Sequence, residues 1–248
     1  MRTWLFDLGN SRLKCAPLRD DGRVGDAIGV AHDGVGLVGD LDGLLPARID
    51  VAYVASVAST AVRVALLDAL AARCGRIVLA STQPRSAGVT IAYAQPPRLG
   101  VDRFLTLLAA HAHCDGNKNS SGRLIVGVGT ALTIDLIDGD GLHRGGRIAP
   151  SPQLMRAALQ ARAAQLPIAG GEYVEFASDT TDALASGCDG AAIALVERSL
   201  HHATALLGTA PRLLLHGGGR AALAAQLPQA IDAPTLVLDG LAVWAQAE

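Results

Sequence analysis

The segment WLFDLGNSRLK places the carboxylate of Asp7 at the end of an apolar run and directly before a glycine turn. Glycine lets backbone N–H groups approach an anion closely, and Asn10 and Ser11 add short hydrogen-bonding side chains. A carboxylate beside such a turn suits Mg²⁺ bound to phosphate, because this cation takes one or two carboxylates together with phosphate oxygens. The alternative is that the carboxylate only accepts hydrogen bonds from the turn amides. When Asp7 is considered without the rest of the chain, this alternative is favoured.

The second half of the chain repeats this pattern. When IVGVGTALTI is laid over LFDLGNSRLK, Gly129 corresponds to Gly9 and Thr130 to Asn10. Both segments are apolar strands that enter a glycine turn and leave as a second strand, so the repeat predicts two similar lobes. Two such turns facing each other would form a clamp for a nucleotide, with Asp7 as the acid on the metal side.

A third glycine cluster, HGGGR (216–220), follows an apolar strand and precedes a helix. Bare glycine backbone there would accommodate the base or sugar of a nucleotide. An ordinary strand-to-helix turn is the alternative.

The acid–base candidate lies in PPRLGVDRF (96–104), where Gly100 precedes Asp102 and Arg103 at the start of a helix. In the functional interpretation, Asp102 accepts the proton of a substrate hydroxyl, as a positioned Asp does in kinases, and Arg103 pairs with an anionic group. The alternative is an Asp that caps the helix N-terminus.

Composition and charge exclude several classes of protein. The 248 residues are 50% hydrophobic and carry a net charge of −2, which indicates a folded globular chain without a basic surface for nucleic acid or an acidic membrane. No apolar run is long enough to span a membrane, and Asp7 comes too early for a signal peptide. The four cysteines form no C-x-x-C pair, so we expect reduced thiols in a cytoplasmic protein.

Strand and helix signals alternate along the chain, which predicts an α/β fold. The expected strands are Thr3–Leu8, Leu13–Leu18, Asp50–Val54, Arg76–Leu79, Leu124–Val128, Leu132–Ile137, Leu142–Ile148, Arg212–His216 and Thr235–Leu238. The expected helices are Ala61–Ala72, Val101–Ala112, Gln153–Gln165, Thr180–Leu206, Arg220–Gln226 and Leu241–Gln246. The polar segment 113–123 predicts a flexible connection between an N-terminal lobe (1–112) and a C-terminal lobe (124–248).

Six motifs in order over nearly the whole length give the chain a family resemblance. It resembles the type III pantothenate kinases, also described as the Bvg accessory factor family, in the acetate/sugar kinase–Hsp70–actin superfamily. The motifs are DLGNSRLK (7–14), YAQPPRLGVDR (93–103), GTALTID (129–135), GGRIAP (145–150), DTTDALASG (179–187) and HGGGR (216–220).

The resemblance implies a fold and an activity. The fold would be two actin-like or ribonuclease H-like lobes, each a mixed sheet flanked by helices, with a nucleotide cleft between them. The activity would be ATP-dependent phosphorylation of pantothenate to 4′-phosphopantothenate, the first step of coenzyme A synthesis. It also implies Mg²⁺, a monovalent cation such as K⁺ or NH₄⁺, and a homodimer.

The resemblance also assigns roles to residues. Asp102 would be the general base, and Thr180 would reach pantothenate from the partner subunit. The implied ATP-binding residues are Asp7, Leu8, Gly9, Asn10, Ser11, Arg12, Leu13, Lys14 and Thr130. The implied pantothenate-binding residues are Tyr93, Gly100, Val101, Asp102, Arg103 and Thr180. Without the resemblance, Tyr93 is interpreted as a strand-face aromatic and Thr180 as an N-cap.

One departure from the family pattern concerns the cation. Gly127 stands where the family has an acidic residue, and in the internal repeat it overlies Asp7. That acid would help hold the monovalent cation. We therefore expect weak kinase activity that responds little to K⁺, and we expect Gly127→Asp to raise this activity. Alternatives are an acid from the partner subunit that completes the site, or a regulatory or binding protein on the same fold.

The helix Thr180–Leu206 predicts the dimer contact. Its segment ASGCDGAAIAL is rich in Ala and Gly and has few charges, which permits close approach of a second helix. The alternative is burial of this segment against its own lobe.

Overall fold

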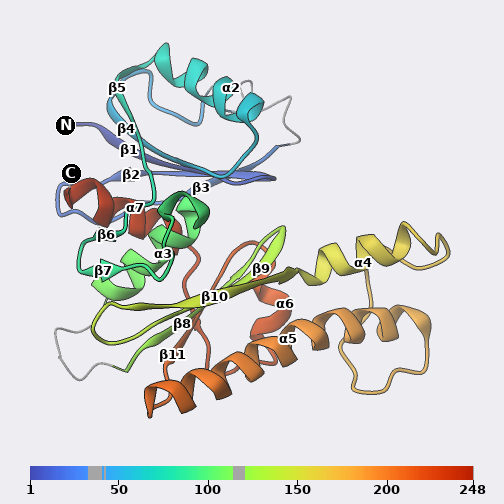
Figure 1. Ribbon diagram of the computed structural model, residues 1–248. Helices are drawn as coiled ribbons and strands as arrows, with labels where there is room; N and C mark the ends of the chain where they lie inside the picture. Colours follow the sequence, from blue (N-terminus) through green and yellow to red (C-terminus); the bar gives the residue numbers. More distant parts are fainter. Residues whose placement is uncertain (33–40, 42, 114–120, 248) are drawn as a thin grey trace. The chain divides into compact units, whose positions relative to one another are not determined.

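The computed structural model describes residues 1–32, 41, 43–113 and 121–247. The chain forms two compact units (Figure 1). The first unit comprises 1–115, 140–143 and 235–248, and the second comprises 116–139 and 144–234. In the described residues, no helix is long and apolar enough to cross a membrane.

The first unit is built on a five-stranded sheet of order β3-β2-β1-β4-β5. Its central strand β1 pairs antiparallel with β2 and parallel with β4. Helix α2 lies on one face of this sheet, and α3 with α7 on the other (Figure 1). The bounds are β1 Thr3–Leu8, β2 Arg12–Leu18, β3 Ile28–Ala31, β4 Ile49–Ser56, α2 Thr60–Ala71, β5 Cys74–Leu79, β6 Arg85–Ser86, β7 Val89–Thr90, η1 Pro96–Arg98, α3 Val101–Ala112 and α7 Leu236–Ala247.

The second unit repeats this topology with a five-stranded sheet of order β10-β9-β8-β11-β12. Strand β8 pairs antiparallel with β9 and parallel with β11, as β1 does with β2 and β4. The long helix α5 packs against β8 and β9. The bounds are β8 Arg123–Val128, β9 Ala131–Ile137, β10 His143–Pro150, α4 Pro152–Gln160, α5 Thr180–Leu207, β11 Arg212–His216, α6 Arg220–Ala224 and β12 Ile231–Asp232.

Each unit has its own apolar core. Around the first turn, Phe6, Leu8 and Leu13 are fully buried and belong to the cluster that α2 covers. In the second unit, Val126, Leu132 and residues of α5 and β11 form the corresponding cluster. The strands beside the turns are therefore anchored by burial of alternate side chains, and the turns project from a fixed base.

The structure confirms the internal repeat and most of the predicted strands and helices. The prediction of a strand near the C-terminus is wrong. The predicted strand Thr235–Leu238 belongs to the start of α7. Thr235 Oγ1 donates a hydrogen bond to Asp239 Oδ2 at 2.9 Å, and its carbonyl accepts from Asp239 N, which begins the helix. The composition of the apolar run Leu236–Leu238 predicts a strand. These residues are buried because the helix packs against another helix, not because they belong to a sheet.

The two units also differ from the predicted lobes. Segment 235–248 belongs to the first unit because α7 packs against α3, and segment 140–143 belongs there as well. At Gly240, an ideal Cβ would lie 1.9 Å from Leu105 O, so glycine permits the close approach of these two helices. Most of the predicted connection 113–123, including Cys114, lies outside the described residues.

Candidate active site

The first glycine turn joins β1 to β2 in the first unit. Gly9 N donates to Arg12 O at 3.0 Å and closes the turn, while Asn10 and Ser11 are exposed. Leu8 and Leu13 are fully buried, so only their backbone is available to a ligand. The turn therefore offers a ligand its polar side chains and its backbone, as the sequence predicts.

Asp7 lies beside this turn, opposite Lys14 in the antiparallel register. Burial raises the pKa of Asp7 to about 7; the Asp102 carboxylate raises it further and the Lys14 ammonium lowers it. The fold thus brings the acid of β1 within electrostatic range of the predicted base on α3, although 95 residues separate them in the sequence. Two carboxylates that oppose each other's ionisation are typical of functional sites.

This carboxylate pair fits a phosphate-bound divalent cation. A divalent cation would favour the ionised form of Asp7, which burial and repulsion from the Asp102 carboxylate disfavour. Among the described residues no group of three or more His, Cys, Asp or Glu side chains could hold a metal ion. The remaining ligands of such a cation would therefore be phosphate oxygens and water, which is how Mg²⁺ is commonly bound.

Asp102 is not the cap of its helix. Gly100 occupies the N-cap position of α3, and Asp102 Oδ1 accepts a hydrogen bond from Arg103 N at 2.8 Å. An ideal Cβ on Gly100 would lie 2.6 Å from Asp102 Oδ1, so glycine leaves room for this carboxylate. The capping alternative is wrong, and the second carboxylate oxygen is not committed to the Arg103 amide.

Arg103 and Tyr93 are brought together, as the family resemblance implies. The Arg103 side chain is buried (7% exposed), and its Nη1 donates to Tyr93 Oη at 3.3 Å. Its guanidinium carbon lies 5.9 Å from the centre of the Tyr93 ring. Tyr93 lies in the loop between β7 and η1, so the strand-face alternative is wrong.

His143 also belongs to this site, although no sequence pattern indicates it. The His143 ring stacks on Tyr93 with centroids 6.0 Å apart and planes 6° apart, and its Nδ1 accepts from Ala92 N at 3.4 Å. His143 is 3% exposed. It comes from the β9–β10 hairpin, 50 residues beyond Tyr93, and no local spacing signals such a contact.

The second glycine turn joins β8 to β9 in the second unit. Gly129 N donates to Ala131 O at 2.9 Å, and Thr130 is exposed. Ser151, which the sequence analysis did not single out, donates from Oγ to Thr130 O at 3.0 Å. Ser151 is 2% exposed, and its hydroxyl also caps α4 by accepting from Leu154 N at 3.2 Å.

The third glycine cluster lies against the end of β8, beside the second turn. Gly219 N donates to Val128 O at 2.9 Å. Gly217 has φ +95°, and an ideal Cβ there would lie 2.3 Å from Val128 O, so this position requires glycine. Arg220 pairs with Asp232 and donates to Gly217 O at 3.2 Å, which holds the glycine loop in place.

The space beside Gly127 is filled by two side chains. An ideal Cβ at Gly127 would lie 2.6 Å from Thr133 Oγ1 and 2.7 Å from His216 Nε2. The His216 imidazole therefore occupies the region into which a carboxylate at position 127 would extend. An aspartate at position 127 would therefore have to displace His216 and Thr133 before it could reach a cation.

Thr180 is the first residue of α5 and is exposed. The cap is Asp179, whose Oδ1 accepts from Thr181 N at 2.8 Å and from Asp182 N at 3.1 Å. Hydrogen bonds from the Asp182 and Thr181 amides lower the pKa of Asp179. The N-cap alternative for Thr180 is therefore wrong, and its hydroxyl is not needed to begin the helix.

Solved structures share the fold at low sequence identity. A conserved Baf family protein from Campylobacter jejuni has a TM-score of 0.63 at 18% identity, with 96% of this chain and 94% of that chain covered. The (R)-2-hydroxyglutaryl-CoA dehydratase component A of Acidaminococcus fermentans has a TM-score of 0.51 at 14% identity, with 100% and 97% covered. These likenesses support the predicted actin-like fold class.

Sequence comparisons identify the family. The family model for type III pantothenate kinase matches residues 4–202. A type III pantothenate kinase of Stenotrophomonas maltophilia (strain K279a) is 56% identical over 245 residues, covering 99% of this chain and 98% of the relative. One from Xylella fastidiosa (strain 9a5c) is 53% identical over 249 residues, with 99% and 98% covered. The chain therefore belongs to the type III pantothenate kinase family.

Proposed function

We propose that this chain transfers the γ-phosphoryl group of ATP to pantothenate, giving 4′-phosphopantothenate and ADP in the first step of coenzyme A synthesis. Family membership over residues 4–202 supports the activity. The observation that supports the assignment of roles is the pairing of Asp7 with Asp102, because it places an acid beside a phosphate turn next to a candidate base. A regulatory role without catalysis gains no support from a protein that shares only the fold at 18% identity.

Asp102 acts as the general base in this proposal. Its carboxylate takes the proton of the primary hydroxyl of pantothenate while that oxygen forms a bond to the γ-phosphorus, and the bond from that phosphorus to the β–γ bridging oxygen breaks. ADP leaves with the electron pair of the broken bond. The hydrogen bond from Arg103 N orients the carboxylate, and Gly100 leaves space for it.

Arg103 recognises the carboxylate of pantothenate. A buried guanidinium is an effective partner for a carboxylate because it offers several donors in a fixed plane. Tyr93 accepts a hydrogen bond from one of these donors, and the His143 ring stacks on the Tyr93 ring and holds it in position. Thr180 of the partner subunit would add a hydroxyl to the same substrate.

ATP contacts come from the segment Asp7–Lys14 and from Thr130, with the glycines of HGGGR on the adenosine side. Lys14 supplies positive charge beside Asp7, and the turn supplies backbone donors. Mg²⁺ bound with ATP would neutralise the phosphate charge, with Asp7 as the acid that holds it. K⁺ or NH₄⁺ would have little effect, because Gly127 supplies no carboxylate for a monovalent cation.

The test of the base is Asp102→Asn, with ADP release measured with and without pantothenate. We expect loss of pantothenate-dependent turnover by at least about 100-fold, because the amide keeps the shape but cannot take the proton. The unfolding midpoint should be no lower than that of the parent, because the amide does not repel the Asp7 carboxylate. Asp68→Asn on the exposed face of α2 is the matched control and should leave turnover unchanged. Turnover of Asp102→Asn within a few-fold of the parent would exclude Asp102 as the base.

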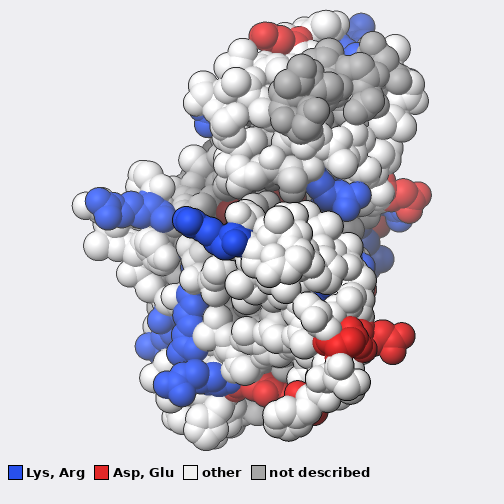
Figure 2. Space-filling model, turned by 90° about the vertical axis from the view of Figure 1, so that its right-hand side faces the viewer, with Lys and Arg blue, Asp and Glu red and all other residues white. Residues whose placement is uncertain are grey.

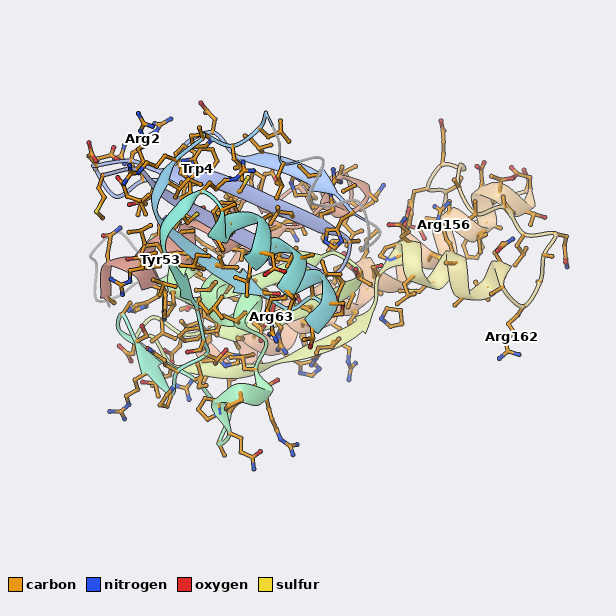
Figure 3. The ribbon with its side chains drawn as sticks, turned by 90° about the horizontal axis from the view of Figure 1, so that it is seen from above. Arg2, Trp4, Tyr53, Arg63, Arg156 and Arg162 are labelled. Atoms are coloured by element: carbon orange, nitrogen blue, oxygen red, sulfur yellow. The ribbon has the colours of Figure 1, made fainter. Side chains whose placement is uncertain are left out.

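We further propose a homodimer formed through the arm that comprises α4, the segment 161–179 and the first half of α5. Part of the small-residue surface of α5 is used within its own unit: an ideal Cβ at Gly171 would lie 3.0 Å from Ala185 Cβ, and one at Gly190 would lie 3.5 Å from Tyr173. Arg156, labelled in Figure 3, also ties α4 to α5 through Asp189 with N···O 3.6 Å. The small residues alone therefore do not indicate a partner.

Exposed apolar side chains on the arm support the dimer instead. Phe176 is 98% exposed and Ile168 63% exposed, and Leu154, Leu159 and Val174 are exposed on the same arm. Uncharged side chains cover most of the face shown in Figure 2. A group of exposed apolar side chains on one arm is typical of a surface that another chain covers.

The dimer is tested by light scattering coupled to size exclusion at micromolar concentration. The parent should give a dimeric mass, and Phe176→Ser combined with Ile168→Ser should shift it toward the monomer. Leu79→Ser, which alters an exposed apolar residue of the first unit, is the matched control and should remain dimeric. A monomeric parent would exclude the proposal.

A further inference from the structure

The first glycine turn is held by the residue that follows strand β3. His32 N donates to Ser11 O at 3.0 Å, and His32 Nε2 lies 3.0 Å from Gly9 O. A carbonyl oxygen only accepts hydrogen bonds, so Nε2 carries the proton and donates it to Gly9 O. His32 Nδ1 is buried and has no hydrogen-bond partner among the described residues, so the ring's one bond in this part of the chain is to the turn.

The second glycine turn is held in a similar way by the residue that follows strand β10. Ser151 Oγ donates to Thr130 O at 3.0 Å and is buried. Strands β3 and β10 occupy equivalent places in the two sheets, each at the end of the order and next to the strand that leaves the turn. His32 and Ser151 therefore follow equivalent strands of the internal repeat, and each donates a side-chain hydrogen bond to its own turn. The acceptor is Gly9 O in the first turn and Thr130 O, one position further along in the repeat, in the second.

We propose that His32 and Ser151 are positioning residues for the two phosphate-binding turns. This inference rests on the proposed role of these turns in binding ATP. Neither residue touches ATP in the proposal; each fixes the peptide plane of a turn whose donors bind phosphate.

The planarity of the peptide bond explains how a bond to a carbonyl positions a donor. In a trans peptide the C=O of one residue and the N–H of the next point in opposite directions. The bond from His32 to Gly9 O therefore directs Asn10 N–H away from His32. Asn10 is exposed, and its N–H has no hydrogen-bond partner among the described residues, so it is available to an anion. Ser151 fixes the Thr130–Ala131 peptide in the same manner.

Steady-state kinetics with three variants of His32 test the proposal. His32→Ala should raise KM for ATP about three- to tenfold, the range of one lost hydrogen bond, and leave KM for pantothenate within about twofold. His32→Gln should restore the parent KM for ATP, because its amide nitrogen reaches the position of Nε2. His32→Asn, whose amide reaches only the position of Nδ1, should behave like His32→Ala. His202→Ala on the exposed face of α5 is the control and should change neither constant.

The second turn is tested with Ser151→Ala and Ser151→Thr. Ser151→Ala should raise KM for ATP by a similar factor, and Ser151→Thr should retain the parent value because it keeps the hydroxyl. Ser151 also caps α4, so the matched control is Ser59→Ala, which removes only the cap of α2. Ser59→Ala should lower the unfolding midpoint without changing KM for ATP.

Lys14→Met separates failure of this inference from failure of the proposed ATP site. A raised KM for ATP in Lys14→Met with an unchanged KM in His32→Ala and Ser151→Ala would overturn the positioning role alone. Unchanged KM for ATP in all three variants would overturn the ATP role of the turns as well. Equal changes of KM for ATP and KM for pantothenate in His32→Ala, not rescued by His32→Gln, would indicate a general structural role and would also overturn the inference.

Discussion

The carboxylate of Asp7 is partly buried at the end of β1, near a second carboxylate and opposite one lysine. The folded chain holds the Asp7 proton up to a pH of about 7, whereas the unfolded chain releases it near the ordinary value of 3.8. Between these values the folded state binds more protons, so the free energy of unfolding falls as the pH rises. Asp7 therefore destabilises the ligand-free protein at neutral pH, as buried charged groups of functional sites commonly do.

We expect Asp7→Asn to stabilise the ligand-free protein and to abolish kinase activity. At pH 8 the free energy of unfolding should rise by roughly 2 kcal/mol, after allowance for partial exposure, because the amide carries no charge to bury. The gain should shrink as the pH falls and vanish near pH 4, where the parent carboxyl is protonated in both states. Urea unfolding at both pH values, without nucleotide or divalent cation, measures it. Equal stability of parent and variant at pH 8 would contradict the burial of charge at this site.

His143 supports a second prediction at the residue scale. His143→Ala removes the ring that stacks on Tyr93 and the acceptor of Ala92 N–H. We expect KM for pantothenate to rise about three- to tenfold while KM for ATP stays constant, because only the substrate loop loses its support. His143→Phe should recover part of the loss, since it keeps the stacked ring. A change confined to KM for ATP would show that this loop does not hold pantothenate.

At the scale of elements, helix packing can require glycine at a position where helix propensity alone favours alanine. Gly240 and Gly187 are both helical glycines, and helix propensity favours alanine at either position. An ideal Cβ at Gly240 would lie 1.9 Å from the Leu105 backbone oxygen, while nothing lies within 4 Å of one at Gly187. The two positions form a matched pair that separates helix propensity from helix packing.

In the background of Phe176→Ser and Ile168→Ser, which removes the proposed dimer contact, we expect Gly187→Ala to stabilise the chain by about 0.5–1 kcal/mol through propensity alone. Gly240→Ala should destabilise it by about 1–3 kcal/mol, because α3 and α7 must move apart to admit the methyl group. Urea unfolding monitored by circular dichroism measures both variants. If Gly240→Ala were neutral, the close packing of α7 on α3 would be wrong.

The elements also show what the sequence could and could not predict. Strand β1 and helix α3 match their predicted bounds because alternation and a helical apolar face are local signals. The prediction of a strand at 235–238 was wrong because Leu236–Leu238 is apolar in order to pack against another helix. The spacing of apolar residues does not distinguish this case from a strand. His32, Ser151 and His143 escaped prediction for a related reason: each acts on a turn or loop at least 21 residues away, through contacts that only the folded chain creates.

At the scale of the whole chain, the two halves repeat a topology but not a chemistry. Both sheets have the same strand order, and in the sequence repeat Gly127 takes the place of Asp7. The first half keeps an acid beside its turn, and the second half has His216 and Thr133 in the equivalent space. An imidazole and a hydroxyl leave no negative charge there for a monovalent cation, so the asymmetry between the halves predicts a kinase with little response to K⁺.

Restoring the carboxylate should therefore require removing the imidazole as well. We expect Gly127→Asp alone to lower the free energy of unfolding by about 1–3 kcal/mol, because its Cβ would lie within 2.7 Å of side-chain atoms of both Thr133 and His216. Kinase activity should fall with stability and remain insensitive to K⁺. Combining Gly127→Asp with His216→Ala should recover part of the lost stability, since Thr133 Oγ1 would still lie 2.6 Å from the new Cβ. The double variant should also make turnover increase with K⁺, measured against Na⁺ at constant ionic strength. His216→Ala alone is the control and should stay insensitive to K⁺, since it adds no charge. If Gly127→Asp alone gained K⁺ activation at full stability, His216 would have to move aside freely, and the space at position 127 would be open after all.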